Sequence, residues 1–136
     1  MLVPIEWINL ISPHDYWRCL YAYIHPINKD ILYIGKAYRC SVRERLKGNH
    51  KKEIYDYIIN TFNVDKLKVL VGFPIIDDGH RISEELVSDL ESLLIIRLKP
   101  PANIISRQTR SIIRPGLKIN CEGAWPHKKR NFIDRA

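Results

Sequence analysis

Tyrosines and a glycine–lysine pair occupy two neighbouring β-favouring segments near the start of the chain. The second segment ends in Tyr33-Ile-Gly-Lys36, where the glycine permits close approach of a backbone or a phosphate and the lysine supplies positive charge. Tyr21 and Tyr23 lie in the first segment and share a face with Tyr33 if the strand register allows it. This pattern indicates either a phosphate-handling site or half-buried sheet tyrosines, and the aromatics alone favour the second.

A basic cluster follows directly on that segment. Its members are Lys36, Arg39, Arg43, Arg45, Lys47, His50, Lys51 and Lys52. Such a cluster forms either a surface that contacts phosphates or a solvated helix face.

A single glutamate stands out later in the chain. Glu91 falls in a segment with helical periodicity, at the edge of the apolar stripe formed by Leu86, Leu90 and Leu93. A carboxylate beside an apolar stripe must be paired, bind a metal or keep access to water. The alternative to a functional role is a glutamate at the rim of the core.

The elements that must position these residues follow from local patterns. We expect a β-hairpin of residues 19–24 and 31–34 with its turn beginning at Pro26, and Gly35 ends its second strand. Further expected elements are a helix from Ser41, whose S-x-x-E sequence is a capping box, a helix over 51–62, a strand over 67–74 and a helix from Ser83 to about Leu98. Residues 1–18 are expected to form an irregular arm or short helix, and the residues after Pro101 a loop or tail. This order predicts an α+β fold with a small sheet and helices packed against it.

Taken together, these residues resemble the GIY-YIG nuclease domain. The resemblance rests on Tyr21-Ala-Tyr-Ile24, on Leu32-Tyr-Ile-Gly-Lys-Ala37, and on Arg45-Leu46 with His50 soon after. It ends with Glu91 and the Pro-Pro-Ala-Asn run that closes at Asn103. It divides the chain into an arm (1–18), a nuclease-like domain (19–103) and a basic C-terminal extension (104–136), which we expect to pack on the domain and contact DNA. The resemblance implies a small three-stranded antiparallel or mixed sheet flanked by helices.

The resemblance also implies roles for individual residues. The family cleaves phosphodiester bonds with one divalent metal, Mg²⁺ or Mn²⁺, which Glu91 would bind. Arg45 would hold the scissile phosphate, Tyr21 and Tyr33 would position or deprotonate the attacking water, and His50 lies near a position where the family often has His or Tyr. Two assignments stay open, because Tyr23 competes with Tyr21 and Arg43 with Arg45.

The net charge of +7 is concentrated at the end of the chain. Residues 1–96 carry 12 Lys+Arg against 13 Asp+Glu, whereas residues 97–136 carry 10 against two, so these parts have net charges of −1 and +8. This asymmetry favours a polyanionic partner, with nucleic acid ahead of an acidic membrane surface. The residues expected to contact DNA are Gly35, Lys36, Arg39, Arg43, Lys47, Lys51, Asn103, Arg107, Arg110 and Arg114. The last three would hold the duplex, and the resemblance implies that Asn103 braces the site.

The remaining composition narrows the setting. At 46% hydrophobic and 27% charged residues, the chain is typical of globular proteins rather than disordered ones. Cys19, Cys40 and Cys121 are widely spaced, which favours buried thiols in a reducing compartment, and we expect a cytoplasmic protein with no membrane segment. The resemblance implies a compact DNA endonuclease of restriction type or of phage or mobile-element type. A restriction-like enzyme would favour a homodimer, because cutting both strands of a duplex needs two active sites. A catalytically silent nucleic-acid-binding module on the same scaffold is the alternative.

Overall fold

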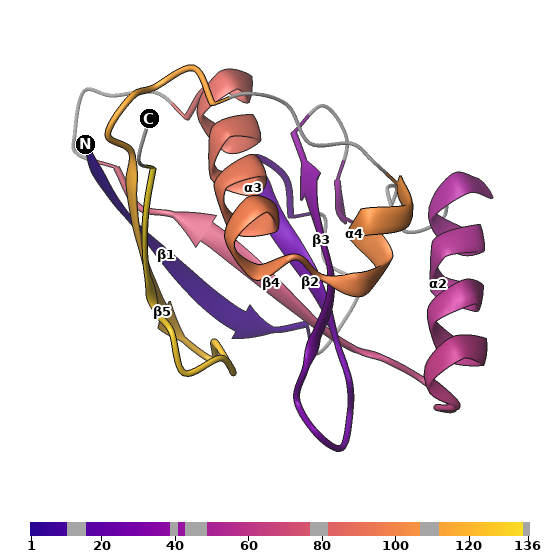
Figure 1. Ribbon diagram of the computed structural model, residues 1–136. Helices are drawn as coiled ribbons and strands as arrows, with labels where there is room; N and C mark the ends of the chain where they lie inside the picture. The colour runs from indigo at the N-terminus through magenta and orange to yellow at the C-terminus, as the bar shows by residue number, and fades with distance from the viewer. Residues whose placement is uncertain (11–15, 39–40, 43–48, 77–81, 107–111, 135–136) are drawn as a thin grey trace.

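The computed structural model describes residues 1–10, 16–38, 41–42, 49–76, 82–106 and 112–134, with only the backbone described at 49–51 and 104–106. The elements are β1 (Leu2–Asn9), β2 (Cys19–Ile24), β3 (Ile31–Ala37), α2 (Asn49–Phe62), β4 (Lys68–Pro74), α3 (Glu84–Leu98), α4 (Pro101–Ser106), β5 (Lys118–Gly123) and β6 (Asn131–Ile133). The fold is α+β, as predicted (Figure 1).

The strands form one curled mixed sheet in the order β3-β2-β4-β1-β5-β6. Among the strands that the structure describes, only β1 and β5 pair in parallel, with Leu2 opposite Lys118 and Trp7 opposite Gly123. The expectation of a three-stranded sheet is therefore wrong, since the described residues contribute six strands. The hairpin, the strand near 67–74 and the helices near 51–62 and 83–98 are confirmed.

The expected arm at the N-terminus is wrong as well, because Leu2–Asn9 is a strand between β4 and β5. Its buried residues Val3, Ile5 and Trp7 alternate with less buried ones, which is the period of a half-buried strand. Pro4 argued against a strand here, because proline is rare inside a central strand.

The expected C-terminal loop is likewise replaced by strands β5 and β6. Ile119 and Cys121 are buried and alternate with Lys118, Asn120 and Glu122. The polar members of this alternation lie in a strongly basic segment, which resembles a solvated tail when read along the chain alone.

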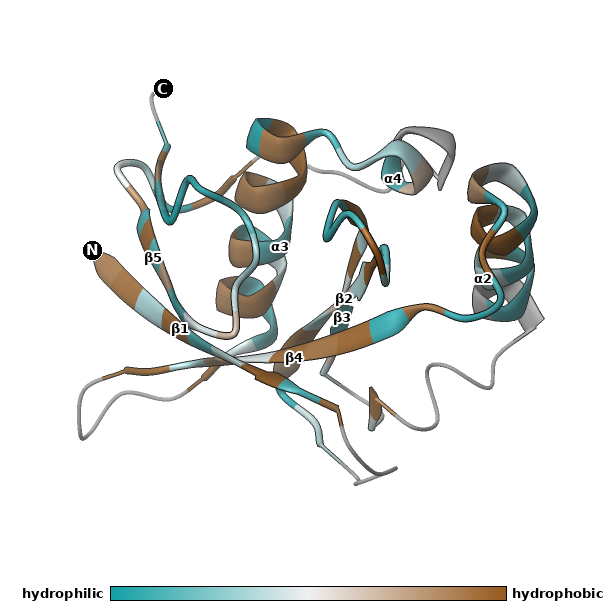
Figure 2. Cartoon of the chain, turned by 90° about the horizontal axis from the view of Figure 1, so that it is seen from below, coloured by the Kyte–Doolittle hydropathy of each residue, from teal (hydrophilic) through white to brown (hydrophobic). Residues whose placement is uncertain are grey.

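Two hydrophobic cores lie on the two faces of the sheet. Helix α3 covers one face through Leu86, Val87 and Leu90, which belong to one core with Val3 of β1 and Ile119 of β5. On the other face, α2 contributes Ile58 and α4 contributes Ala102, and both belong to a core with the tyrosines of the hairpin. Figure 2 shows hydrophobic residues along β1, β4 and α3.

Helix α3 begins and ends as its sequence predicts. Ser83 is its N-cap, and its Oγ accepts a hydrogen bond from Leu86 N at 3.1 Å. Lys99 closes the helix in the left-handed conformation with φ of 50°, directly before Pro100. Strand β3 runs to Ala37, so it does not end at Gly35 as expected, because Gly35 still pairs with Tyr21 and Ala37 with Cys19.

Candidate functional site

The hairpin register brings Tyr21 opposite Gly35 and Tyr23 opposite Tyr33. The Tyr21 ring lies directly over Gly35: a Cβ added to this glycine would lie 2.5 Å from Tyr21 Cζ and 2.6 Å from its hydroxyl oxygen. Glycine is therefore required here by the close approach of a side chain, not by its own backbone angles. This contact distinguishes Tyr21 from Tyr23 in space, although the choice of motif tyrosine stays open.

The three hairpin tyrosines share one face of the sheet. Their ring centroids are separated by 5.9 Å for Tyr21 and Tyr23, 6.1 Å for Tyr21 and Tyr33, and 5.6 Å for Tyr23 and Tyr33. All three side chains are buried, with at most 1% exposed. Burial raises the pKa of Tyr23, and the neighbouring Tyr33 and Tyr55 raise it further. The common face is confirmed, and the tyrosines are fully buried rather than half-buried.

Asn103 connects the end of the predicted domain to the edge strand β3. Its Oδ1 accepts a hydrogen bond from Ile34 N and its Nδ2 donates one to Ile34 O, both at 2.8 Å. Asn103 is buried, and β3 is the first strand of the sheet, so this side chain satisfies backbone groups on an edge that another strand would otherwise pair. The carboxamide braces the Tyr-Ile-Gly segment.

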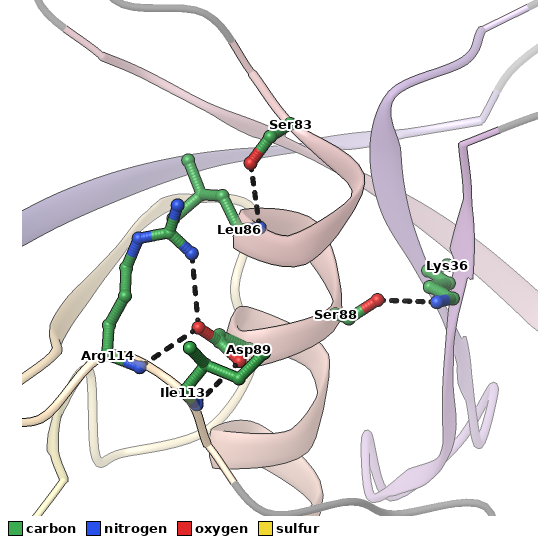
Figure 3. Close-up of polar contacts among 7 residues, drawn as sticks. All are labelled: Lys36, Ser83, Leu86, Ser88, Asp89, Ile113 and Arg114. Carbon is green, nitrogen blue, oxygen red and sulfur yellow. Dashed lines mark hydrogen bonds and ion pairs between the residues drawn. The ribbon is translucent and has the colours of Figure 1, made fainter.

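Lys36 and the helix that carries Glu91 meet on the opposite side of β3. Side chains alternate along a strand, so Lys36 projects away from the face of Tyr33 and Gly35. Its Nζ donates a hydrogen bond to Ser88 Oγ on α3 (Figure 3). Glu91 follows Ser88 by three residues and therefore lies on the same side of the helix, where it is half-buried. The structure thus brings Lys36 near the Glu91 turn of α3, with the tyrosines on the other face.

A single half-buried carboxylate suits Mg²⁺, which binds through one or two carboxylates and keeps several waters. Within the described ranges, no three His, Cys, Asp or Glu side chains gather into a group that holds a metal ion. One carboxylate such as Glu91 is compatible with the metal that the resemblance implies.

Several predicted site residues lie outside the described part of the chain. These are Arg39, Arg43, Arg45, Lys47, Arg107 and Arg110. His50 and Lys51 fall in α2, where only the backbone is described, and Lys52 is exposed on the same helix.

Arg114 is the one described member of the three arginines expected to hold DNA, and it forms an ion pair. Its Nη1 lies 3.1 Å from Asp89 Oδ2, and Asp89 also accepts hydrogen bonds from the backbone N–H groups of Ile113 and Arg114 (Figure 3). The Asp89 side chain is fully buried, whereas that of Arg114 is 33% exposed. Asp89 was not predicted from the sequence. Its position three residues after Leu86, in an apolar stripe, indicates a buried carboxylate that needs donors.

Cys19 and Cys121 are buried and free, as expected for both. Burial raises the pKa of each thiol to about 12. Cys40 lies outside the described residues.

Comparisons with models of protein families, with curated proteins and with solved structures gave no match. None of the helices in the described ranges has the length and hydropathy needed to cross a membrane.

Proposed function

We propose that this chain is a divalent-metal-dependent endonuclease of the GIY-YIG type that hydrolyses phosphodiester bonds in DNA. The observation that carries the proposal is the pair of hydrogen bonds between Asn103 and Ile34. These residues are 69 positions apart, and they belong to two of the motifs on which the family resemblance depends. The contact supports the bracing role that the resemblance implies for Asn103.

The proposed roles of the side chains follow from their chemistry. Glu91 would hold Mg²⁺ or Mn²⁺, which when bound would polarise a phosphoryl oxygen. Lys36 carries positive charge beside the same turn of α3 and would favour an anionic substrate there. Arg45 would grip the scissile phosphate, because a guanidinium can bind it through two hydrogen bonds. We assign Tyr33 no role at Glu91, because its side chain is buried on the opposite face of the sheet from α3.

A plasmid-cleavage assay tests this proposal. The wild-type chain should nick or linearise DNA with Mg²⁺ and spare it in EDTA, and Glu91→Gln and Arg45→Ala should each lower the rate at least on the order of a hundredfold. Glu85→Gln is the matched control, since it removes an exposed carboxylate from the same helix. Undiminished, metal-dependent cutting by Glu91→Gln would overturn the assignment of the metal ligand.

The second candidate function is a nucleic-acid-binding module without turnover. The burial of Tyr21 and Tyr33 favours it, since side chains with at most 1% exposure do not meet a substrate unless the cover over them moves. This module would bind DNA in a salt-dependent manner and would leave the plasmid intact with either metal. Glu91→Gln separates the two functions: it should slow cleavage by a nuclease and leave DNA binding by a silent module unchanged.

A further inference from the structure

A basic cleft lies between the C-terminal half of α3 and the edge strand β6. Its volume is about 320 Å³, and the described residues that line it are Arg97, Lys129, Asn131 and Ile133. Arg97 Nη2 donates a hydrogen bond to Ile133 O at 3.1 Å, which joins the helix wall to the strand wall. The cleft is therefore framed by two elements that are held together.

The two cations of the cleft are positioned by their surroundings. A guanidinium has five N–H donors, so the bond from Arg97 to Ile133 orients the group and leaves donors for an anion. The Lys129 ammonium lies 5.4 Å from the centre of the Phe132 ring. The backbone of Lys129 is anchored as well, because its N–H donates to His127 Nδ1 at 3.0 Å and its carbonyl accepts from Trp125 Nε1 at 2.9 Å.

The cleft has the charge and donors of a phosphate site. Its described lining residues include two cations and the carboxamide of Asn131, with no carboxylate among them. Cations gathered in a concave surface raise the local concentration of anions. Arginine and lysine are also the side chains that supply most phosphate contacts in protein–DNA complexes.

The cleft and Glu91 lie on different sides of the same helix. Arg97 follows Glu91 by six residues on α3, which is about 9 Å along the helix axis and about 240° around it. Arg97 is bonded to the edge strand β6, whereas the Glu91 turn lies beside Lys36 of β3, the opposite edge of the sheet. A phosphate bound in the cleft would therefore be a contact separate from the one proposed at Glu91.

We propose that this cleft binds a backbone phosphate of DNA. The proposal rests on the proposed nuclease function for its choice of DNA. It assigns duplex binding to Arg97 and Lys129, neither of which was among the residues expected to contact DNA.

Binding of a labelled short duplex in EDTA tests the proposal without cleavage. The wild-type chain is compared with Arg97→Gln/Lys129→Gln and with Lys66→Gln/Lys68→Gln, a control of equal net charge that removes two exposed lysines at the start of β4. Fluorescence anisotropy at several salt concentrations gives the slope of log affinity against log salt. We expect the cleft variant to have a slope shallower by about two and the control to change by less than one. Equal slopes in the two variants would overturn the proposal.

Two further measurements separate the sources of phosphate and the two proposals. Calorimetry with inorganic phosphate shows whether the cleft takes a free anion. If the cleft variant loses phosphate binding but keeps its affinity for the duplex, the proposal that the cleft binds DNA is overturned. Plasmid cleavage with Mg²⁺ is measured independently. If the plasmid is cut but the cleft variant and the control have equal salt slopes, only the proposal for the cleft is refuted. If the slopes differ but the plasmid is not cut, only the proposed nuclease function is refuted.

Discussion

The Tyr21 ring occupies the space that any side chain at Gly35 would need. Tyr21 is fully buried, so its ring has no solvent to swing into when a methyl group appears at position 35. The glycine of the Tyr-Ile-Gly segment is thus explained by packing across the hairpin. Its contact with the Tyr21 ring brings β2 and β3, which carry the two tyrosine segments of the proposed motif, close together.

Gly35→Ala should lower the free energy of unfolding by about 1–3 kcal/mol through overpacking. Urea denaturation measures this change. A Tyr21→Leu background should relieve the overlap, so the cost of Gly35→Ala should be smaller there. Equal costs in the two backgrounds would show that the Tyr21 ring is not the obstacle.

Asn103→Leu should expose the edge of β3. Ile34 loses the acceptor for its N–H and the donor for its carbonyl, which should lower the free energy of unfolding by about 2–4 kcal/mol. Hydrogen exchange gives the local readout. The Ile34 amide should exchange faster than global destabilisation explains, with the Leu70 amide in the inner strand β4 as the reference. If both amides accelerate equally, the carboxamide has no specific effect on this edge.

Local patterns in the sequence predicted the parts of the fold that depend on neighbours along the chain. Ser83 at the start of α3 and Pro26 in the hairpin turn act within a few residues, and the structure has them where the patterns indicated. The register of Tyr23 against Tyr33 follows from the hairpin itself.

The missed elements depend on contacts far apart in the chain. Strand β1 is stabilised by parallel pairing with β5, where Leu2 lies opposite Lys118, and no local pattern encodes such a partner. Asp89 was missed for a related reason, since its donors at Ile113 and Arg114 come from a distant segment. The residues of the candidate site were predicted from their types. The face of β3 on which each side chain lies could be assigned only from the strand pairing in the sheet.

The buried thiols predict a loss of stability at alkaline pH. Cys19 and Cys121 have a folded pKa of about 12, whereas an unfolded cysteine has a pKa of about 8.5. Above pH of about 8.5 the unfolded chain releases these protons and the folded chain keeps them, so the free energy of unfolding falls as pH rises.

The decrease should approach about 1.4 kcal/mol per pH unit for each thiol. Urea denaturation in reductant between pH of about 7 and 9 measures it, because few tyrosines, with a pKa of about 10, are ionised in this range. In Cys19→Ala/Cys121→Ala the fall should be much smaller. An equally steep fall in this variant would assign the effect to other groups.

Arg114→Gln should act first on stability. Asp89 is fully buried and Arg114 supplies two of its donors, so removing the guanidinium leaves a carboxylate with less compensation. Because the Arg114 side chain is 33% exposed, solvent screens part of the loss, and we expect about 1–2 kcal/mol by urea denaturation. Asp89→Asn should cost a similar amount of stability, and the double variant should cost less than the sum of the two.

A guanidinium that is paired with Asp89 contributes little to binding of the duplex. The salt slope of DNA binding should therefore change by less than one in Arg114→Gln. An unchanged free energy of unfolding together with a slope shallower by about one would instead make Arg114 a phosphate contact, as its place in the basic C-terminal segment first indicated.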